Sequence, residues 1–321
     1  MKNKPIIVVH GQPNSIFLEI FLKSLTYKKF KSPIILIAST KLLSFEMIRT
    51  NINFKINQID INNLKNLKLL KSKINLINVD FNKSKNKRNN IILSNNYISR
   101  SFDIALFLIN KKLSNKLING PISKKDFLNK KFLGITEYLV KKTKTKNYAM
   151  LIYNDKISVS PITTHLPLKF VSKNINKETI INKVKLINNF YKKKLGINPR
   201  IAVLGLNPHC ESIDKFNEDE KILKPTIKKL IKEKFNVSGP HPADTIFLKK
   251  NRINYDVVVG MYHDQVLTPI KALYEFNAIN ITLGLPFIRI SPDHGPNEKM
   301  IGKNVSSPLS LIKAITFLDK N

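Results

Sequence analysis

Residues 200–209 read RIAVLGLNPH, a short aliphatic and β-branched run that stops at Gly205 and is followed by a polar turn with His209. A run of this length is typical of a buried strand. The same pattern returns in VSPITTH, which ends at His165, and in VVVGMYH, which ends at His263. Each histidine therefore follows the expected carboxyl end of a strand. In open α/β sheets, ligands bind just beyond the carboxyl ends of the strands.

Strand patterns of this kind alternate with helical patterns along most of the chain, and the alternation predicts a mostly parallel sheet covered by helices. The expected strands are Ile6–Val9, Ile34–Ala38, Ile74–Val79, Tyr148–Tyr153, Ile157–Thr163, Arg200–Leu204, Asp256–Val259 and Ala278–Thr282. A 3.6-residue periodicity predicts helices over Ser15–Leu25, Ile104–Leu113, Thr179–Tyr191, Glu218–Lys234 and Leu309–Leu318. Residues 81–90, FNKSKNKRNN, are expected to form a surface loop.

The composition bounds the class of protein. A length of 321 residues is typical of two domains or of one large domain with two lobes. The single cysteine, Cys210, excludes an intramolecular disulfide framework and any Cys-rich metal site. No apolar run approaches the roughly 18 residues of a membrane span, and the segment after Met1 is too short for the apolar region of a signal peptide. We therefore expect a soluble, cytoplasmic α/β protein.

The net charge of +33 brings nucleic-acid binding into question. Nearly all of the positive charge is Lys, only six residues are Arg, and Trp is absent. Base readout and phosphate clamping favour Arg, and single-strand binding adds aromatic side chains. The lysines are spread along the chain, so we expect solvated surfaces and no nucleic-acid partner. A Lys-driven nucleic-acid-binding protein stays open as an alternative, and the charge would also attract small anions.

Individual residues point to a ligand site. Three imidazoles at strand ends, with open positions for substrate or water, suit Zn²⁺ or a similar divalent ion, although each could instead be an ordinary hydrogen-bonded turn residue. Arg289 beside an apolar run indicates carboxylate or phosphate binding, with an ion pair as the alternative. No glycine spacing matches GxGxxG or a P-loop, so a dinucleotide held in the usual Rossmann manner is not expected.

Seven motifs occur in one order along the chain: Gly120-Pro121-Ile122-Ser123-Lys124, Thr163-Thr164-His165-Leu166-Pro167-Leu168, Gly205-Leu206-Asn207-Pro208-His209, Pro242-Ala243-Asp244-Thr245, Met261-Tyr262-His263-Asp264-Gln265, Asn280–Arg289 and Asp293-His294-Gly295. This ordered set resembles the 4-hydroxythreonine-4-phosphate dehydrogenase family (PdxA) of vitamin B6 biosynthesis. The resemblance runs from about Gly120 to the C-terminus and is looser before that residue.

The resemblance implies a fold and a reaction. The fold is a two-lobed α/β/α architecture like that of isocitrate and isopropylmalate dehydrogenases, with the active site in the interlobe cleft. The whole chain, 1–321, would be one catalytic unit with lobe boundaries near 120 and 238. The reaction is oxidation of the C3 hydroxyl of 4-hydroxythreonine 4-phosphate by NAD, with NADP as the alternative. The resulting β-keto acid decarboxylates to 3-amino-2-oxopropyl phosphate in pyridoxine 5'-phosphate biosynthesis.

The resemblance also assigns residues. One divalent cation (Zn, Co, Mn or Mg) would be bound at a homodimer interface by His165, His209 and His263, one of them from the partner subunit. The substrate-binding residues would be Thr136, Lys271, Asn280 and Arg289. The general base is not identifiable from the sequence. Asp264 and Asp244 are candidates, either for that role or for orienting a metal-binding histidine.

The chain departs from the family pattern at Ile135, where the family carries a substrate-binding histidine. His241 is a candidate replacement. Gly11–Phe17 and the stretch after His209 are also less glycine-rich than the family pattern. The departure at Ile135 favours one alternative function, a sister dehydrogenase acting on another phosphorylated hydroxy acid such as 4-phosphothreonate. A metal-dependent hydrolase is a more distant alternative.

Overall fold

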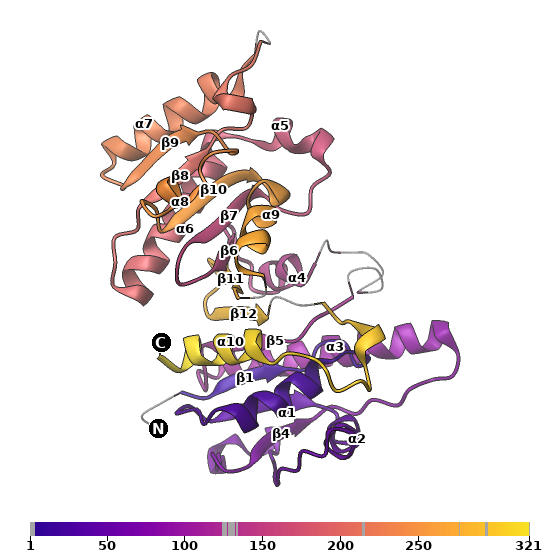
Figure 1. Cartoon of the computed structure of the whole chain (residues 1–321). Coiled ribbons are helices and arrows are strands. Elements are labelled where there is room, and N and C mark those ends of the chain that lie inside the picture. The colour runs from indigo at the N-terminus through magenta and orange to yellow at the C-terminus, as the bar shows by residue number, and fades with distance from the viewer. Residues whose placement is uncertain are drawn as a thin grey trace. The chain divides into compact units, whose positions relative to one another are not determined.

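The chain divides into two units in the computed structural model (Figure 1): Met1–Leu139 with Pro286–Asn321, and Val140–Leu285. The structure describes residues 4–123, 127, 132, 134–213, 216–275, 277–292 and 295–320, without the side chain of Lys65. The first unit is therefore built from both ends of the chain, and the second is continuous.

These divisions differ from the boundaries near 120 and 238 that the sequence suggested. Gly120 is packed inside the first unit, because a Cβ added there would lie 2.0 Å from the carbonyl oxygen of His10. Gly239 lies within strand β9 (Val237–His241) of the second unit, where an added Cβ would lie 2.3 Å from the carbonyl oxygen of Val203. Both glycines thus serve close packing within a unit and do not link two units.

The first unit holds a sheet whose described strands are all parallel. In spatial order they are β3 (Ile56–Gln58), β4 (Ile74–Asn78), β2 (Ile34–Ala38), β1 (Ile6–Val9), β5 (Lys116–Asn119) and β12 (Ile288–Pro292). Its helices are α1 (Phe17–Tyr27), α2 (Thr40–Thr50), α3 (Lys87–Asn110) and α10 (Leu309–Lys320), and α4 (Ile135–Lys142) begins in it. Strands β1 and β5 are buried along their whole length, as expected of parallel strands covered on both faces.

The strand order of this unit determines which face of the sheet each helix covers. The chain moves from β1 through α1 to β2, then returns past β1 from β4 through α3 to β5. Because such crossovers are right-handed, the reversal of direction places α3 on the opposite face from α1. Helix α10 packs against α1 and against β1, β5 and β12.

The second unit has a mixed sheet. In spatial order its described strands are β11 (Ile279–Leu283), β6 (Ala149–Tyr153), β7 (Ser158–Thr163), β10 (Val257–Tyr262), β8 (Ile201–Leu204) and β9 (Val237–His241). Strand β6 is antiparallel to both its neighbours, and the run from β7 to β9 is parallel. Its helices are α5 (Val171–Asn174), α6 (Lys177–Phe190), α7 (Lys224–Lys232), α8 (Lys249–Arg252) and α9 (His263–Tyr274). The carboxyl ends of the four parallel strands point the same way, so the residues that follow these strands lie on the same side of the sheet.

The α/β class and all eight expected strands are confirmed, with bounds that differ by at most a few residues. Strands β3, β5, β9 and β12 were not expected. The loop expected over residues 81–90 is wrong at its end, because α3 begins at Lys87. Asn86 caps this helix by accepting a hydrogen bond from the backbone of Asn89 at 3.2 Å, a capping role that asparagine commonly fills. Within the described residues, no helix is long and apolar enough to span a membrane.

Candidate active site

Three histidines follow three neighbouring strands of the second unit. His165 lies just past β7, His263 is the first residue of α9 directly after β10, and His209 lies in the short turn Pro208–Cys210 after β8. Strand β10 pairs in parallel with both β7 and β8. The structure therefore places all three histidines beyond the carboxyl ends of neighbouring parallel strands, as their position after each predicted strand indicates.

Two of these histidines are close together. The ring centroids of His165 and His263 are 5.7 Å apart, with 40° between the ring planes. The Nδ1 atom of His263 lies 2.7 Å from a carboxylate oxygen of Asp264, so Nε2 is the nitrogen that points away from this contact. No group of three or more His, Cys, Asp or Glu side chains in the described part of the chain is arranged to hold a metal ion. A single chain thus brings together two of the three predicted ligands.

The loop that carries His209 is held by a buried acid. His209 and Cys210 have φ angles of 55° and 64°, a left-handed conformation that costs energy for residues other than glycine. The carboxylate of Asp219, which is fully buried, accepts hydrogen bonds from the backbone of Leu206 at 2.9 Å and of Asn207 at 3.1 Å. It also accepts one from the side-chain amide of Asn207 at 2.9 Å. Asp219 therefore fixes the start of this loop.

A second polar side chain joins the two histidine-bearing segments. The amide oxygen of Gln265 accepts from the backbone of Met261 at 2.6 Å, and its nitrogen donates to the carbonyl oxygen of Gly205 at 2.8 Å. The end of β10, just before His263, is thereby tied to the loop before His209. Neither Gln265 nor Asp219 was predicted from the sequence to have a role in this site. Gln265 is part of a quoted motif, but nothing in the spacing of Asp219 reveals its partners.

Asp244 and Asp264 differ in their surroundings. Asp264 is exposed and engaged with His263. Asp244 is also exposed and follows β9, and its negative charge acts on Cys210, the residue after His209. Burial, the charge of Asp219 and the charge of Asp244 together raise the pKa of the Cys210 thiol. Cys210 is therefore a protonated, buried side chain at neutral pH.

Arg289 and Thr136 meet in the first unit, although they are far apart in the sequence. Arg289 lies in β12 and is only 1% exposed. Its Nε donates to the side-chain oxygen of Asn119 at 2.7 Å, and its Nη1 donates to the hydroxyl of Thr136 at 3.2 Å. Burial lowers the pKa of Arg289 to about 10, opposed by the charge of Glu137, so the guanidinium is charged at neutral pH. A surface ion pair does not describe this residue. Asn119 was not singled out from the sequence.

Lys271 and Asn280 lie in the second unit, on α9 and β11. Lys271 shares its helix with His263 and is half-buried. The side-chain oxygen of Asn280 is buried and has no hydrogen-bond partner among the described residues. An unpaired buried acceptor costs about 1–3 kcal/mol, a cost that a ligand donor would remove.

The positions that depart from the family pattern are also described. Ile135 is the first residue of α4 and is half-buried. His241, the candidate replacement, has its Nε2 2.8 Å from the hydroxyl of Ser238 and 3.2 Å from that of Tyr255. Burial lowers the pKa of His241, so its ring is a neutral partner of these hydroxyls. The motif residues Lys124, Asp293 and His294 lie outside the described residues.

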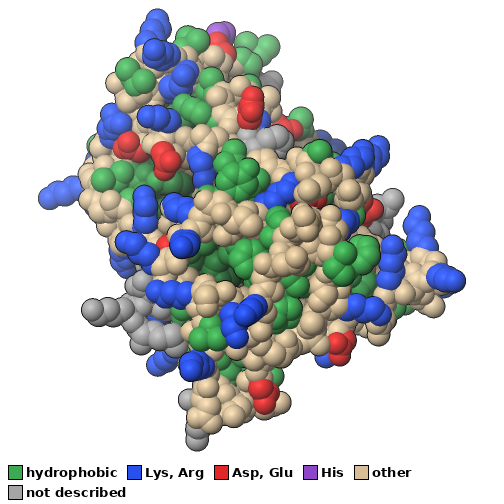
Figure 2. All heavy atoms as spheres, turned by 60° about the horizontal axis from the view of Figure 1, so that its bottom comes forward, with side chains coloured by type: hydrophobic (Ala, Val, Ile, Leu, Met, Phe, Trp, Pro, Cys, Tyr) green, Lys and Arg blue, Asp and Glu red, His purple; other side chains and the backbone are tan. Residues whose placement is uncertain are grey.

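The positive charge is not gathered in one stripe on the face seen in Figure 2. Lys and Arg side chains lie at many points of that face, between polar and apolar ones. This distribution is what the sequence predicts for lysines that fill solvated surfaces.

Comparison with known proteins identifies relatives. The family model for the pyridoxal phosphate biosynthetic protein PdxA matches residues 29–318. A 4-hydroxythreonine-4-phosphate dehydrogenase of Sulfurihydrogenibium sp. is 38% identical over 97% of this chain and 96% of its own. A D-threonate 4-phosphate dehydrogenase of Pectobacterium atrosepticum is 37% identical over 57% of this chain and 56% of its own.

Solved structures agree with these relatives. A 4-hydroxythreonine-4-phosphate dehydrogenase of Klebsiella pneumoniae has a TM-score of 0.83 and 28% identity, with 99% of each chain covered. An isocitrate dehydrogenase of Methylococcus capsulatus, 9% identical with a TM-score of 0.50 over 98% of this chain and 84% of its own, is alike in fold alone. The predicted dehydrogenase-like architecture is confirmed. From the extent of the family match and of the first relative, the chain belongs to the PdxA family of pyridoxal phosphate biosynthetic proteins and is a dehydrogenase.

Proposed function

We propose that this enzyme oxidises the C3 hydroxyl of 4-hydroxythreonine 4-phosphate with NAD⁺. Bound NAD⁺ would supply the acceptor for the hydride from C3, and a base of the chain would take the hydroxyl proton. The β-keto acid then loses CO₂ to give 3-amino-2-oxopropyl phosphate. The observation that carries this proposal is the pairing of His165 with the Asp264-bound His263, at the edge where α/β sheets bind ligands.

The residues at this edge fit a divalent cation, and we propose that His165, His209 and His263 hold it. Imidazole suits Zn²⁺ and Co²⁺, and Mn²⁺ or Mg²⁺ are the alternatives. A carboxylate on the second ring nitrogen, as Asp264 provides for His263, is the usual partner of a metal-binding histidine. Such a cation would lower the pKa of the substrate hydroxyl. In a homodimer that shares this site, one of the three histidines would come from the partner subunit.

The chain's own polar groups bind and orient the substrate. The Arg289 guanidinium is held in place by Asn119 and Thr136, so little freedom is lost when it meets a phosphate or carboxylate. Because the hydroxyl of Thr136 accepts from Arg289, its own proton can be donated to the substrate. The Asn280 amide offers a further contact, and Lys271 supplies positive charge.

Of the two acids considered as the base, Asp264 contacts Nδ1 of His263 and is placed to orient that ring. We therefore assign Asp264 a positioning role and regard Asp244 as the candidate that takes the hydroxyl proton. An Asp264→Asn variant is then expected to lose metal affinity, whereas Asp244→Asn is expected to lower kcat with metal affinity unchanged. The reverse pattern would exchange the two roles.

A second candidate is a sister dehydrogenase that acts on a phosphorylated hydroxy acid such as 4-phosphothreonate. Two observations favour it: Ile135 stands where the family carries a histidine, and a relative at 37% identity is named a D-threonate 4-phosphate dehydrogenase. The ratio of kcat/KM for the two substrates decides between the candidates.

The test is NADH formation from 4-hydroxythreonine 4-phosphate, with and without a chelator, and with NADP⁺ in place of NAD⁺. Metal analysis of His263→Ala and His209→Ala should show strongly reduced occupancy, with His241→Gln as the matched control. Mixing inactive His165→Ala with inactive His209→Ala should restore part of the activity through hybrid dimers. Full metal retention in both alanine variants would reject the ligand set. If activity does not recover although subunit exchange is demonstrated, the shared site is rejected.

A further inference from the structure

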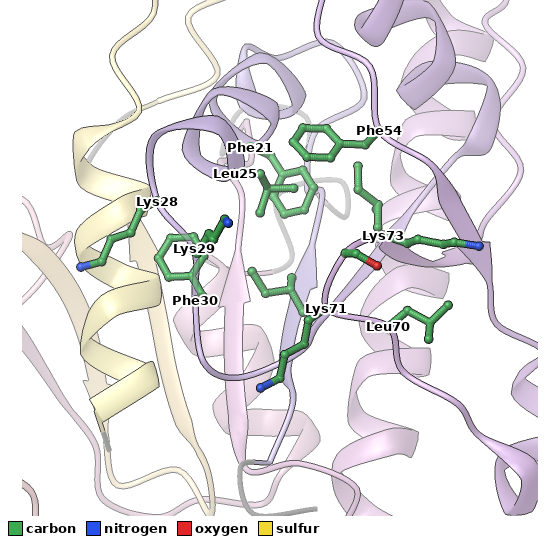
Figure 3. Close-up of a pocket in the computed structure, with 12 residues that line it drawn as sticks. Phe21, Leu25, Lys28, Lys29, Phe30, Phe54, Leu70, Lys71 and Lys73 are labelled. Atoms are coloured by element: carbon green, nitrogen blue, oxygen red, sulfur yellow. The ribbon is translucent and has the colours of Figure 1, made fainter.

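The first unit contains a cavity of about 470 Å³ away from the residues discussed above (Figure 3). This volume lies within the roughly 300–1,000 Å³ typical of small-molecule sites. The end of α1, the segment before β2 and the segment before β4 form its walls.

The interior of this cavity is apolar. Phe21 and Leu25 come from α1, Phe30 from the segment that follows it, and Phe54 and Leu70 from segments near β3 and β4. Phe21 is fully buried, whereas the other four are half-buried. Apolar side chains that remain half-exposed around a hollow provide a surface that an apolar ligand can cover.

The opening of the cavity is basic. Lys28, Lys29, Lys71 and Lys73 line it, and no Asp or Glu does. Figure 3 shows the apolar side chains lying between these lysines, whose amino groups point to different sides. Lys28 donates to the hydroxyl of Thr316 at 3.2 Å, and none of the four lysines forms an ion pair with a carboxylate of the described residues. A chain with 55 Lys and Arg places lysines on most surfaces, but no Asp or Glu is among the residues that line this cavity.

The cavity lies at the amino ends of the strands of this sheet, whereas the proposed substrate contacts lie at the carboxyl ends. Ile34 and Ile74, which line it, are the first residues of β2 and β4. Asn119, which holds Arg289, is the last residue of β5, parallel to those strands. A ligand in the cavity therefore does not occupy the position of the substrate.

We propose that this cavity binds a small amphiphilic anion, an aliphatic or aromatic body with one carboxylate or phosphate. The body would cover Phe21, Leu25, Phe30, Phe54 and Leu70, and the anionic group would lie at the opening among the lysines. An uncharged body would gain only the apolar contact, and a cationic one would be repelled.

The absence of tryptophan allows a direct test. A Phe54→Trp variant places a single tryptophan in the cavity wall, with Phe30→Trp as a second reporter. Decanoate, kept below its micelle concentration, should change the fluorescence of both reporters with saturation. Adding Lys29→Gln and Lys71→Gln should weaken decanoate binding by about tenfold, since each partly exposed charge contact contributes a few-fold. Lys41→Gln with Lys85→Gln, exposed lysines outside the cavity, is the matched control and should leave the affinity unchanged.

Decanol and decyltrimethylammonium separate charge recognition from apolar binding. Decanol should bind more weakly than decanoate and equally in all lysine variants, and the cation should not bind. The proposal is rejected if neither reporter responds to decanoate, if decanol binds as tightly, or if both lysine pairs have the same effect. A response to anionic lipid vesicles without one to free decanoate would also reject it, because that result assigns the surface to a membrane.

Discussion

Asp219→Asn is the sharpest test of how the His209 loop is held. One carboxylate oxygen accepts from Leu206, and the other accepts twice from Asn207. An asparagine has one acceptor oxygen, so its NH₂ group must face at least one of these donors. The variant therefore loses one or two charge-assisted hydrogen bonds in a fully buried place. It also places the new NH₂ group against another N–H donor, with which it cannot form a hydrogen bond.

Each charge-assisted bond contributes about 1.5–3 kcal/mol, so the free energy of unfolding should fall by about 3 kcal/mol, measured by urea denaturation. Loss of a supporting contact typically weakens metal binding by about 10–100-fold, and a Co²⁺ titration should show a decrease in that range. Asp60→Asn is the matched control. Asp60 is exposed and accepts from the backbone of Asn62 at 2.9 Å, a cap that asparagine also makes, so the change should stay below about 0.5 kcal/mol. If Asp219→Asn behaves like this control in both measurements, the loop is not held as argued.

Three further outcomes are expected. Arg289→Lys cannot keep the contacts to both Asn119 and Thr136, so KM for the phosphorylated substrate should rise about tenfold in steady-state assays; an unchanged KM would contradict the assignment. Burial lowers the pKa of His10 from 6.5 to about 3, so below pH 6.5 the unfolded chain binds a proton that the folded chain does not, and stability falls as pH decreases. His10→Asn should therefore reduce the slope of unfolding free energy between pH 6.5 and about 4 by up to ~1.4 kcal/mol per pH unit, and an equal slope would contradict the argument. Ile135→His should lower KM for 4-hydroxythreonine 4-phosphate about tenfold if one hydrogen bond is gained, and an unchanged or raised KM would show that another residue has that role.

The strands were predictable where their residues are uniformly apolar. Strands covered on both faces read as continuous β-branched runs, and β1 and β2 were predicted residue for residue. The missed strands carry residues that break this pattern. In β12 the buried Arg289 interrupts the run, and in β9 Gly239 and Pro240 do so. These polar or irregular residues lie in strands because of packing and function that local sequence does not encode.

The partners of the site residues were less predictable than their positions. The histidines were visible because each lies within five residues of the end of a strand. The contact between Arg289 and Thr136 depends instead on strand order, since β12 lies beside β5 with Arg289 opposite Leu117. Sequence separation gives no sign of such a contact. Asp219 similarly accepts a hydrogen bond from Asn207, a residue 12 positions away in the sequence.

The effect of having isoleucine in place of histidine at position 135 can be separated from the proposed binding of the substrate's charged groups. Ile135 and Thr136 are the first two residues of α4, and consecutive helical side chains point about 100° apart. The hydroxyl of Thr136 meets Arg289 without any contribution from residue 135, and Glu137, the next residue, adds its charge to the same guanidinium. Losing an imidazole at 135 therefore removes one neutral donor and leaves the group that would meet phosphate or carboxylate in place. Both candidate substrates are phosphorylated hydroxy acids, so the role proposed for Arg289 would be the same with either one. We infer that residue 135 acts on the choice between them, and that this choice can change without loss of dehydrogenase chemistry.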